Sequence, residues 1–191
     1  FFLYLAFNAP HFPLHAPKEE IAKYADVYAK GWDAIREERY GRQKKLGRVR
    51  DGWPLTPRSP CENHYKREHG VNPAWDPLPP ARRADLARRM AIFAGMVDRM
   101  DQNVGRVLDD LRTNGQLDNT LVVFLSDNGY SLGSHRNPWK DCAYEECVHL
   151  PLMIHRPGQT TNGSIDALAG SMDIAPTIAD MTGATPGAAA E

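Results

Sequence analysis

The feature that most constrains the fold is a run of apolar residues at positions 121–125 (LVVFL) that ends abruptly in Ser126, Asp127, Asn128 and Gly129. Its β-branched and aromatic side chains predict a strand that is buried on both faces, as in a parallel sheet. In an open α/β sheet, ligands bind in the crevice beyond the carboxyl ends of the strands. Asp127 and Asn128 would face that crevice, and two adjacent hard oxygen donors suit Ca²⁺ or Mg²⁺ far better than a soft metal.

A long amphipathic helix is predicted directly before this strand, from position 81 to position 114. Pro79 and Pro80 precede it, and Gly115 supplies a left-handed stop. Arginines and aspartates are interleaved along it, which argues against a nucleic-acid-binding patch. A helix followed by a strand is the order of elements in a parallel α/β layer. The apolar residues that form one face of the helix are Leu86, Met90, Phe93, Val97, Met100, Val104, Val107 and Leu111.

Residues 1–7 (FFLYLAF) predict a second buried strand, followed by a proline-rich loop that contains His11. If this strand and the strand at 121–125 are parallel neighbours in one sheet, His11 shares a rim with Asp127. A histidine there can donate a hydrogen bond to an anionic oxygen or protonate a leaving group. The alternative is a loop histidine held only by packing.

The region from position 48 to position 80 has no periodicity and accumulates prolines, so we expect a long irregular excursion. Such a loop is commonly a lid or a substrate-facing wall. Its aromatic residues Trp53, Tyr65 and Trp75 either line an apolar approach to a pocket or, as the favoured alternative, anchor the loop to the body of the protein. The shorter elements predicted elsewhere are helices at 18–29 and 32–46 and a strand at 150–155.

Composition limits the classes of function that the chain can have. Its 191 residues, 42% hydrophobic and 25% charged, are enough to bury one sizeable core, and a net charge of −1 gives no attraction to nucleic acid or anionic membranes. No run approaches the ~20 apolar residues of a membrane span. Cys61, Cys142 and Cys147 lack C-x-x-C spacing and cannot all pair, so neither a zinc site nor a disulfide framework is predicted. Because the chain starts in mid-strand without a methionine, we expect it to be a fragment.

A set of residues in the second half of the chain carries a family resemblance: the segment at 120–129 (TLVVFLSDNG), Gly133, His135, Lys140, the Tyr-Glu-Glu of 144–146 and the Leu-Pro-Leu of 150–152. Through these residues the chain resembles the sulfatase family of the alkaline-phosphatase-like superfamily, and within it the bacterial arylsulfatase-like members. The resemblance implies an α/β fold, an alkaline-phosphatase-like sandwich whose mostly parallel sheet is flanked by helices and is incomplete in this chain. Residues 1–191 would then form a partial catalytic domain with the excursion at 48–80.

The resemblance also assigns roles to individual residues. Asp127 and Asn128 are similar to metal ligands of the family, which implies Ca²⁺, with Mg²⁺ as the alternative ion. Lys140 is similar to the lysine that contacts the substrate sulfate. His11 belongs to a His-x-Pro segment similar to the one whose histidine binds sulfate, and His135 resembles a frequent site histidine. An ammonium group near the metal would offset charge on the leaving oxygen.

One departure from the family pattern concerns the nucleophile. Sulfatases form it from the Cys or Ser of a C/S-x-P-x-R motif, oxidised to formylglycine, and no Cys or Ser of this chain begins that motif. The chain therefore resembles the later part of a catalytic domain, with the formylglycine and further metal carboxylates expected upstream. Since Ca²⁺ takes roughly six to eight oxygens, we expect the chain alone to bind metal weakly and not to hydrolyse aryl sulfates.

The expected activity is hydrolysis of a small-molecule or saccharide sulfate ester, without nucleic-acid or membrane partners, in a periplasmic or secreted enzyme. No motif predicts an oligomeric state. Two alternatives stay open. A hydrolase of phosphate or phosphonate esters would use much the same pocket, because tetrahedral oxyanions present similar oxygens. A catalytically inactive binding or structural module is favoured by the missing nucleophile motif.

Overall fold

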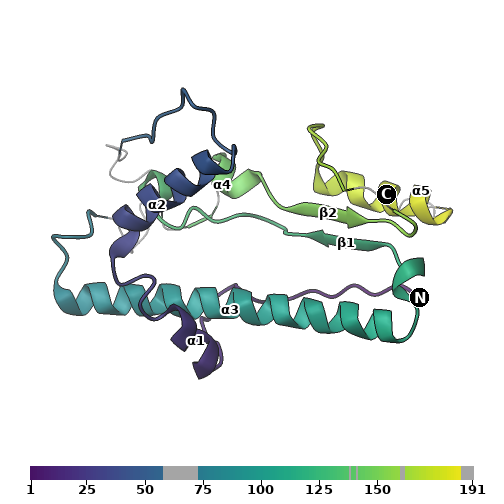
Figure 1. Cartoon of the computed structure of the whole chain (residues 1–191), viewed down its shortest axis with the longest axis horizontal. Helices are drawn as coiled ribbons and strands as arrows, with labels where there is room; N and C mark the ends of the chain where they lie inside the picture. Colours follow the sequence, from purple (N-terminus) through teal and green to yellow (C-terminus); the bar gives the residue numbers. More distant parts are fainter. Residues whose placement is uncertain (58–72, 138, 141, 160–161, 186–191) are drawn as a thin grey trace, which may run out of the picture.

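The computed structural model describes residues 1–57, 73–137, 139–140, 142–159 and 162–185. In this part of the chain a long helix, α3, runs along one side, and a small sheet lies beside it (Figure 1). The helices and strands in chain order are α1 (Lys18–Tyr24), α2 (Gly31–Lys45), α3 (Pro80–Thr113), β1 (Val122–Leu125), α4 (Glu145–Val148), β2 (Leu152–His155) and α5 (Ile174–Thr182). Single turns of 3₁₀ helix cover Leu117–Asn119 (η1), Ser134–Arg136 (η2) and Ser171–Asp173 (η3).

α3 confirms the predicted long helix, and both of its ends follow the predicted signals. Pro79 is the N-cap residue, and Pro80, which has no backbone N–H to leave unpaired, is the first helical residue. The chain leaves the helix through Gly115, whose φ of 66° is in the left-handed region. The predicted apolar face is only partly buried, and the fully buried positions are Ala87, Ala91, Gly95 and Met96. None of the described helices has both the length and the apolar character of a bilayer span.

α1 packs against α3 at one of these small residues. A Cβ on Gly95 would lie 3.3 Å from the Cβ of Ala16 and from backbone atoms of Glu20 and Ile21. The absence of a side chain at Gly95 therefore lets the two helices approach closely. α1 ends at Tyr24 and not at position 29 as predicted, because the following residues form turns that lead into α2.

A cluster of charged and polar side chains links α1 to α3. The Lys23 ammonium lies 2.9 Å from Asp98 Oδ2 and is also paired with the buried carboxylate of Glu20. Gln102 Nε2 donates hydrogen bonds to Glu20 Oε1 at 2.9 Å and to Asp98 Oδ1 at 2.8 Å. The hydrogen bond from Lys23, followed by that from Gln102, lowers the pKa of Asp98 to about 2 from its ordinary 3.8. The same two donors lower the pKa of Glu20.

We expect this cluster to make the protein sensitive to acid. Because the folded-state pKa of Asp98 lies below its unfolded value, the ionised carboxylate stabilises the fold at neutral pH, and this stabilisation is lost as the pH falls from about 4 towards about 2. Asp98→Asn should therefore lower the melting temperature at pH 7, and the difference from the wild type should shrink over that acid range. Thermal unfolding followed by circular dichroism between pH 7 and pH 2 measures both effects.

Asp109→Asn is the matched control, since Asp109 lies on the same helix in an exposed pair with Arg112 that is expected to contribute little. A constant difference between Asp98→Asn and the wild type at every pH would contradict the prediction.

The described parts of the irregular excursion confirm that Trp75 anchors it. Trp75 is buried, its ring packs edge-on against Trp32 with centroids 4.8 Å apart, and its backbone N–H donates to Asp33 Oδ2 at 2.9 Å. A Cβ on Gly31 would overlap the Trp75 ring, so the start of α2 is shaped around this anchor. Trp53 is largely exposed, and Tyr65 lies outside the described residues.

The sheet differs from the predicted one. β1 and β2 pair antiparallel, with Val122 opposite His155 and Leu125 opposite Leu152, so the expectation of a mostly parallel sheet is wrong for the described strands. Parallel strands need a long crossover that returns the chain to the same end of the sheet. Here the described residues between positions 126 and 151 contain only η2 and the four-residue α4, and the chain turns back at the end of β1. β1 is also half-buried, with Leu125 exposed, and not buried on both faces as predicted.

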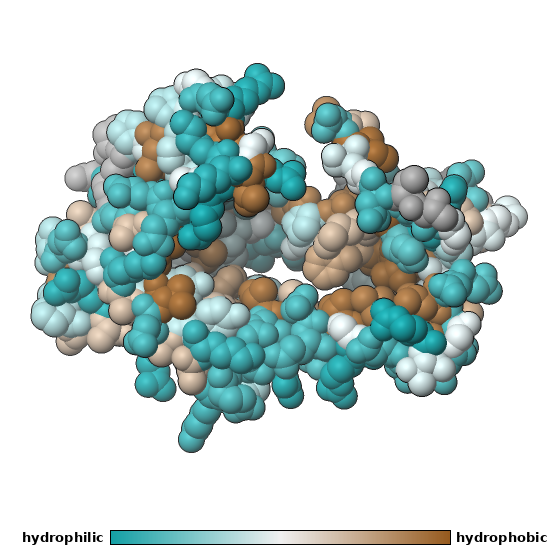
Figure 2. Space-filling model, viewed as in Figure 1, coloured by the Kyte–Doolittle hydropathy of each residue, from teal (hydrophilic) through white to brown (hydrophobic). Residues whose placement is uncertain are grey.

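Residues 1–7 do not form the predicted buried strand. They run as an extended trace without pairing to a described strand (Figure 1), and Phe1, Phe2 and Tyr4 are 83%, 79% and 80% exposed. The apolar composition of residues 1–7 favours burial. The edge of β1 opposite β2 likewise lacks a partner among the described residues. Figure 2 shows apolar residues gathered around the hollowed middle of this face. Among the described residues, no pairing between residues 1–7 and β1 therefore supports the predicted sheet edge shared by His11 and Asp127.

Candidate active site

Asp127 and Asn128 lie directly beyond the carboxyl end of β1, as predicted. β1 ends at Leu125, and the next residues form a turn held by their own side chains. Asp127 Oδ1 accepts the backbone N–H of Asn128 at 2.8 Å, and Asn128 Nδ2 donates to the carbonyl oxygen of Gly129 at 2.9 Å. Asp127 is exposed, whereas Asn128 is half-buried. The turn thus presents a carboxylate with one oxygen free of this local hydrogen bond.

Lys140 meets Asn128 in the structure. Its half-buried Nζ donates a hydrogen bond to Asn128 Oδ1 at 3.2 Å, although the two residues are 12 positions apart in the sequence. A lysine of an ordinary surface loop extends its side chain into solvent. Lys140 instead places its positive charge beside the turn after β1. The structure therefore brings together two of the predicted site residues, an amide and an ammonium group, and Asp127 directly precedes the amide in the chain.

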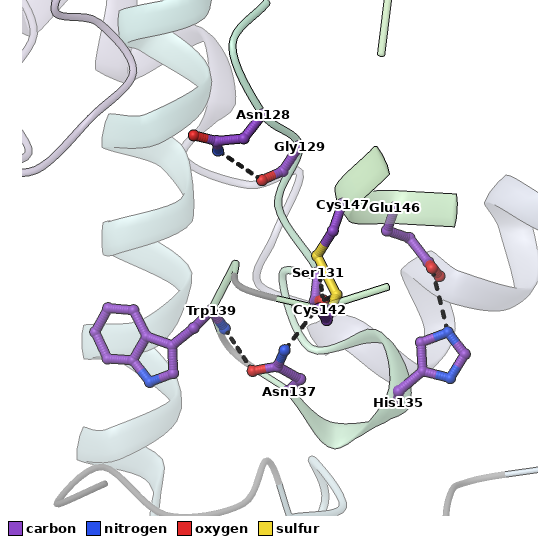
Figure 3. The surroundings of a disulfide bond; sticks show 9 residues. All are labelled: Asn128, Gly129, Ser131, His135, Asn137, Trp139, Cys142, Glu146 and Cys147. Atoms are coloured by element: carbon purple, nitrogen blue, oxygen red, sulfur yellow. Dashed lines mark hydrogen bonds and ion pairs between the residues drawn. A yellow bond between two sulfur atoms is a disulfide. The ribbon is translucent and has the colours of Figure 1, made fainter. Parts of the chain in front are cut away.

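The loop that begins at Asn128 packs against α4 (Figure 3). The backbone N–H of Gly129 donates to the carbonyl oxygen of Cys147 at 3.0 Å, and a Cβ on Gly129 would overlap the carbonyl oxygen of Glu146. The N–H of Ser131 donates to the carbonyl oxygen of Trp139 at 3.0 Å. The close approach requires a glycine at position 129.

A disulfide joins Cys142 to Cys147, which the sequence interpretation missed. The first turn of α4 brings the two Cα atoms within 5.8 Å, inside the range that disulfides need. The buried Ser131 side chain lies against the bond, with Oγ 3.3 Å from Cys142 Sγ and 3.4 Å from Cys147 Sγ (Figure 3). The odd number of cysteines hid this pair, and the C-x₄-C spacing of Cys142 and Cys147 was the available signal.

His135 lies against Glu146 and Tyr144, and its role as a site histidine stays a prediction. Its Nε2 lies 3.2 Å from Glu146 Oε2, and its ring stacks on Tyr144 with centroids 3.7 Å apart. Burial alone would raise the pKa of Glu146, but its own backbone N–H and the neighbouring His135 outweigh burial and lower that pKa. In the view of Figure 3 the disulfide lies between His135 and Asn128. Glu146 and Tyr144 are thus partners of His135 to which the sequence interpretation gave no role.

His11 makes only local contacts. Its Nδ1 donates to the carbonyl oxygen of Phe12 at 2.7 Å, and the side chain is exposed. Among the described residues, no hydrogen bond or ion pair joins His11 to Asp127, Asn128 or Lys140. Its role as a sulfate-binding histidine stays a prediction.

The donor set fits a hard divalent cation in kind. Asp127 offers a carboxylate and Asn128 an amide oxygen, both of the type that Ca²⁺ and Mg²⁺ prefer. Over the described ranges, no group of three or more His, Cys, Asp or Glu side chains is placed to hold a metal ion. Because Ca²⁺ takes roughly six to eight oxygens, these two residues would supply part of its shell.

Comparison with known proteins identifies the family of this chain. The family model described as Sulfatase matches residues 1–184. An uncharacterized sulfatase of Schizosaccharomyces pombe is 43% identical over 68% of this chain and 22% of its own length, and an arylsulfatase of Klebsiella aerogenes is 29% identical over 97% of this chain and 47% of its own. The chain thus spans less than half the length of these curated relatives.

A solved structure shares the arrangement of the elements. It contains a protein in complex with its substrate, D-glucosamine-2-N,6-O-disulfate, and matches 95% of this chain and 33% of its own chain at 26% identity and a TM-score of 0.51. The small size of the described sheet accords with a match to a third of that protein. With a family match over almost its whole length, the chain belongs to the sulfatase family.

Proposed function

We propose that the full-length protein hydrolyses sulfuric esters and that this chain supplies part of its metal and sulfate pocket. The observation that carries the proposal is the contact of Lys140 Nζ with Asn128 Oδ1 at 3.2 Å, beside Asp127 at the end of β1. A cation site and a lysine that adjoin one another suit a substrate with several anionic oxygens on one tetrahedral centre. Membership of the sulfatase family supports sulfur as that centre.

In this proposal each residue has a separate task. Asp127 and Asn128 hold a divalent cation, Ca²⁺ or Mg²⁺, which when bound polarises the sulfate oxygens. Lys140 binds a sulfate oxygen through its ammonium group and offsets the charge that develops there. His11 contacts the ester side of the substrate. His135, whose Nε2 lies 3.2 Å from Glu146 Oε2, takes part as a further site histidine. No Cys or Ser of this chain fits a formylglycine nucleophile, so the chain contributes no nucleophile of that kind.

The substrate class we propose is a small-molecule or saccharide sulfate ester. The saccharide disulfate bound by the similar solved protein supports the second of these. We also propose that the protein works in an oxidising compartment, the periplasm or the exterior of the cell. The Cys142–Cys147 disulfide supports that location, because such bonds persist where the thiol-reducing systems of the cytosol are absent.

A paired substrate comparison on the purified full-length protein tests the proposed reaction. 4-Nitrophenyl sulfate and 4-nitrophenyl phosphate carry the same leaving group, so any difference in kcat/KM reports the preferred oxyanion. We expect the sulfate ester to be preferred when Ca²⁺ is present, and this chain alone to be inactive. A preference for phosphate would replace the proposal with the phosphoester alternative, and hydrolysis of neither ester by the full-length protein would favour the inactive module.

A further inference from the structure

We propose that the Cys142–Cys147 disulfide is a positioning element that holds Lys140 against Asn128, so that reducing the bond weakens sulfate binding. The inference rests on the proposed function for the role of Lys140, and on the contacts around the disulfide for the positioning. Cys142 lies two positions beyond Lys140, and Cys147 contacts the backbone next to Asn128. The bond therefore joins the two segments that deliver the amide and the ammonium group.

The contacts form a closed ring that includes both site residues. Asn128 is followed by Gly129, whose N–H is bound to the carbonyl oxygen of Cys147 at 3.0 Å. The disulfide then leads from Cys147 to Cys142, and the backbone leads on to Lys140. Lys140 closes the ring by its 3.2 Å hydrogen bond to Asn128. Only two of these connections are hydrogen bonds, and the others are covalent.

Ser131 ties the disulfide to the middle of the same loop. The side chain is 2% exposed, and because both sulfurs are in the disulfide its hydroxyl is the donor towards them. Asn137 Nδ2 donates to Ser131 Oγ at 3.4 Å, and Asn137 Oδ1 accepts the N–H of Trp139 at 3.0 Å. These hydrogen bonds therefore connect the sulfurs, through the Ser131 hydroxyl and the Asn137 side chain, to the backbone before Lys140.

Reduction opens the ring at its covalent link. A dithiol supplies two electrons and two protons, the bond between the sulfurs breaks, two thiols form, and the dithiol becomes a disulfide. The segment between Gly129 and Cys147 then loses its covalent cross-link, and it gains conformational freedom that has to be lost again for Lys140 to meet Asn128. Misplacing a binding group by about 1 Å can cost of order 10²-fold in rate, so we expect a loss of at least ~10-fold in kcat/KM.

A double-mutant cycle in the full-length protein separates positioning from general stability. The disulfide is removed by the double variant Cys142→Ser/Cys147→Ser, in the wild type and in Lys140→Ala. If the bond acts through Lys140, its removal lowers kcat/KM for 4-nitrophenyl sulfate in the wild type, mainly through KM, and has little further effect in Lys140→Ala. An equal loss in both backgrounds, or no loss in the wild type, overturns the inference. Cys61→Ser is the control for removing a thiol elsewhere.

Reversible reduction of the folded protein covers the case in which the double variant fails to fold. Treatment with dithiothreitol should raise KM, and reoxidation should restore it. Hydrogen exchange gives a readout that needs no turnover: the amides of Gly129 and Ser131 should exchange faster after reduction, while amides in the middle of α3 stay unchanged. If the wild type hydrolyses no sulfate ester, the proposed function fails, and unchanged exchange at these two amides would separately overturn the positioning role.

Discussion

Lys140→Ala is expected to lower kcat/KM of the full-length protein for a sulfate monoester by ~10²–10³-fold, the usual cost of removing one preorganised group that stabilises developing charge. The reason is the location of the ammonium group, 3.2 Å from the Oδ1 atom of Asn128, the residue that follows Asp127. Part of the loss should appear as weaker inhibition by inorganic sulfate, because the same group would hold the product anion. Steady-state kinetics with and without added sulfate measure both effects.

Lys45→Ala is the matched control for this substitution. Lys45 is an exposed lysine at the end of α2, and its replacement should leave kcat/KM and sulfate inhibition at the wild-type values. Lys140→Arg keeps the charge but alters the shape of the donor group, so it should be intermediate. If Lys140→Ala kept wild-type inhibition by sulfate, Lys140 would not be part of the anion site.

Asp127→Ala is expected to abolish the binding of the divalent cation and with it the activity. The carboxylate supplies the only negative charge that the turn after β1 offers among its described residues 126–129, and removing it leaves a neutral amide beside an ammonium group. We expect Ca²⁺ to raise the melting temperature of the wild-type full-length protein and to leave that of Asp127→Ala unchanged. Isothermal titration calorimetry with Ca²⁺ provides the affinity directly.

Two further variants divide this effect into its parts. Asp127→Asn keeps an oxygen that accepts the backbone N–H of Asn128 and removes only the charge, so a loss of Ca²⁺ binding in this variant assigns the effect to charge. Asp118→Ala removes an exposed carboxylate in η1, before β1, and should bind Ca²⁺ as the wild type does. A calcium-dependent rise in melting temperature that survives in Asp127→Ala would place the cation elsewhere.

The parts of the fold that sequence reasoning predicted well are those with local signals. The ends of α3 are encoded by Pro79, Pro80 and Gly115, which act within one turn of the helix. The end of β1 is marked by the change from apolar residues to Ser126. The nearness of Lys140 to Asn128 followed from the family resemblance and is confirmed as a contact, whereas the chemical roles of both residues stay predictions.

The parts that were missed depend on contacts between segments far apart in the sequence. The apolar pattern of residues 152–155 is the same for a parallel and an antiparallel strand, and the path of the connection from β1 decides the direction. The disulfide forms because the first turn of α4 folds Cys147 back towards Cys142. For His135, no local pattern indicated that Glu146 and Tyr144 would contact its ring.

The edge of β1 that no described residue pairs with and the exposed aromatic side chains of residues 1–7 have a practical consequence for anyone who produces this chain by itself. Unpaired strand edges next to apolar surface are templates for edge-to-edge aggregation, and this chain presents both on one molecule. A preparation of the isolated chain would therefore suffer from precipitation and inclusion bodies, and its poor solubility would be easily mistaken for a failure to fold.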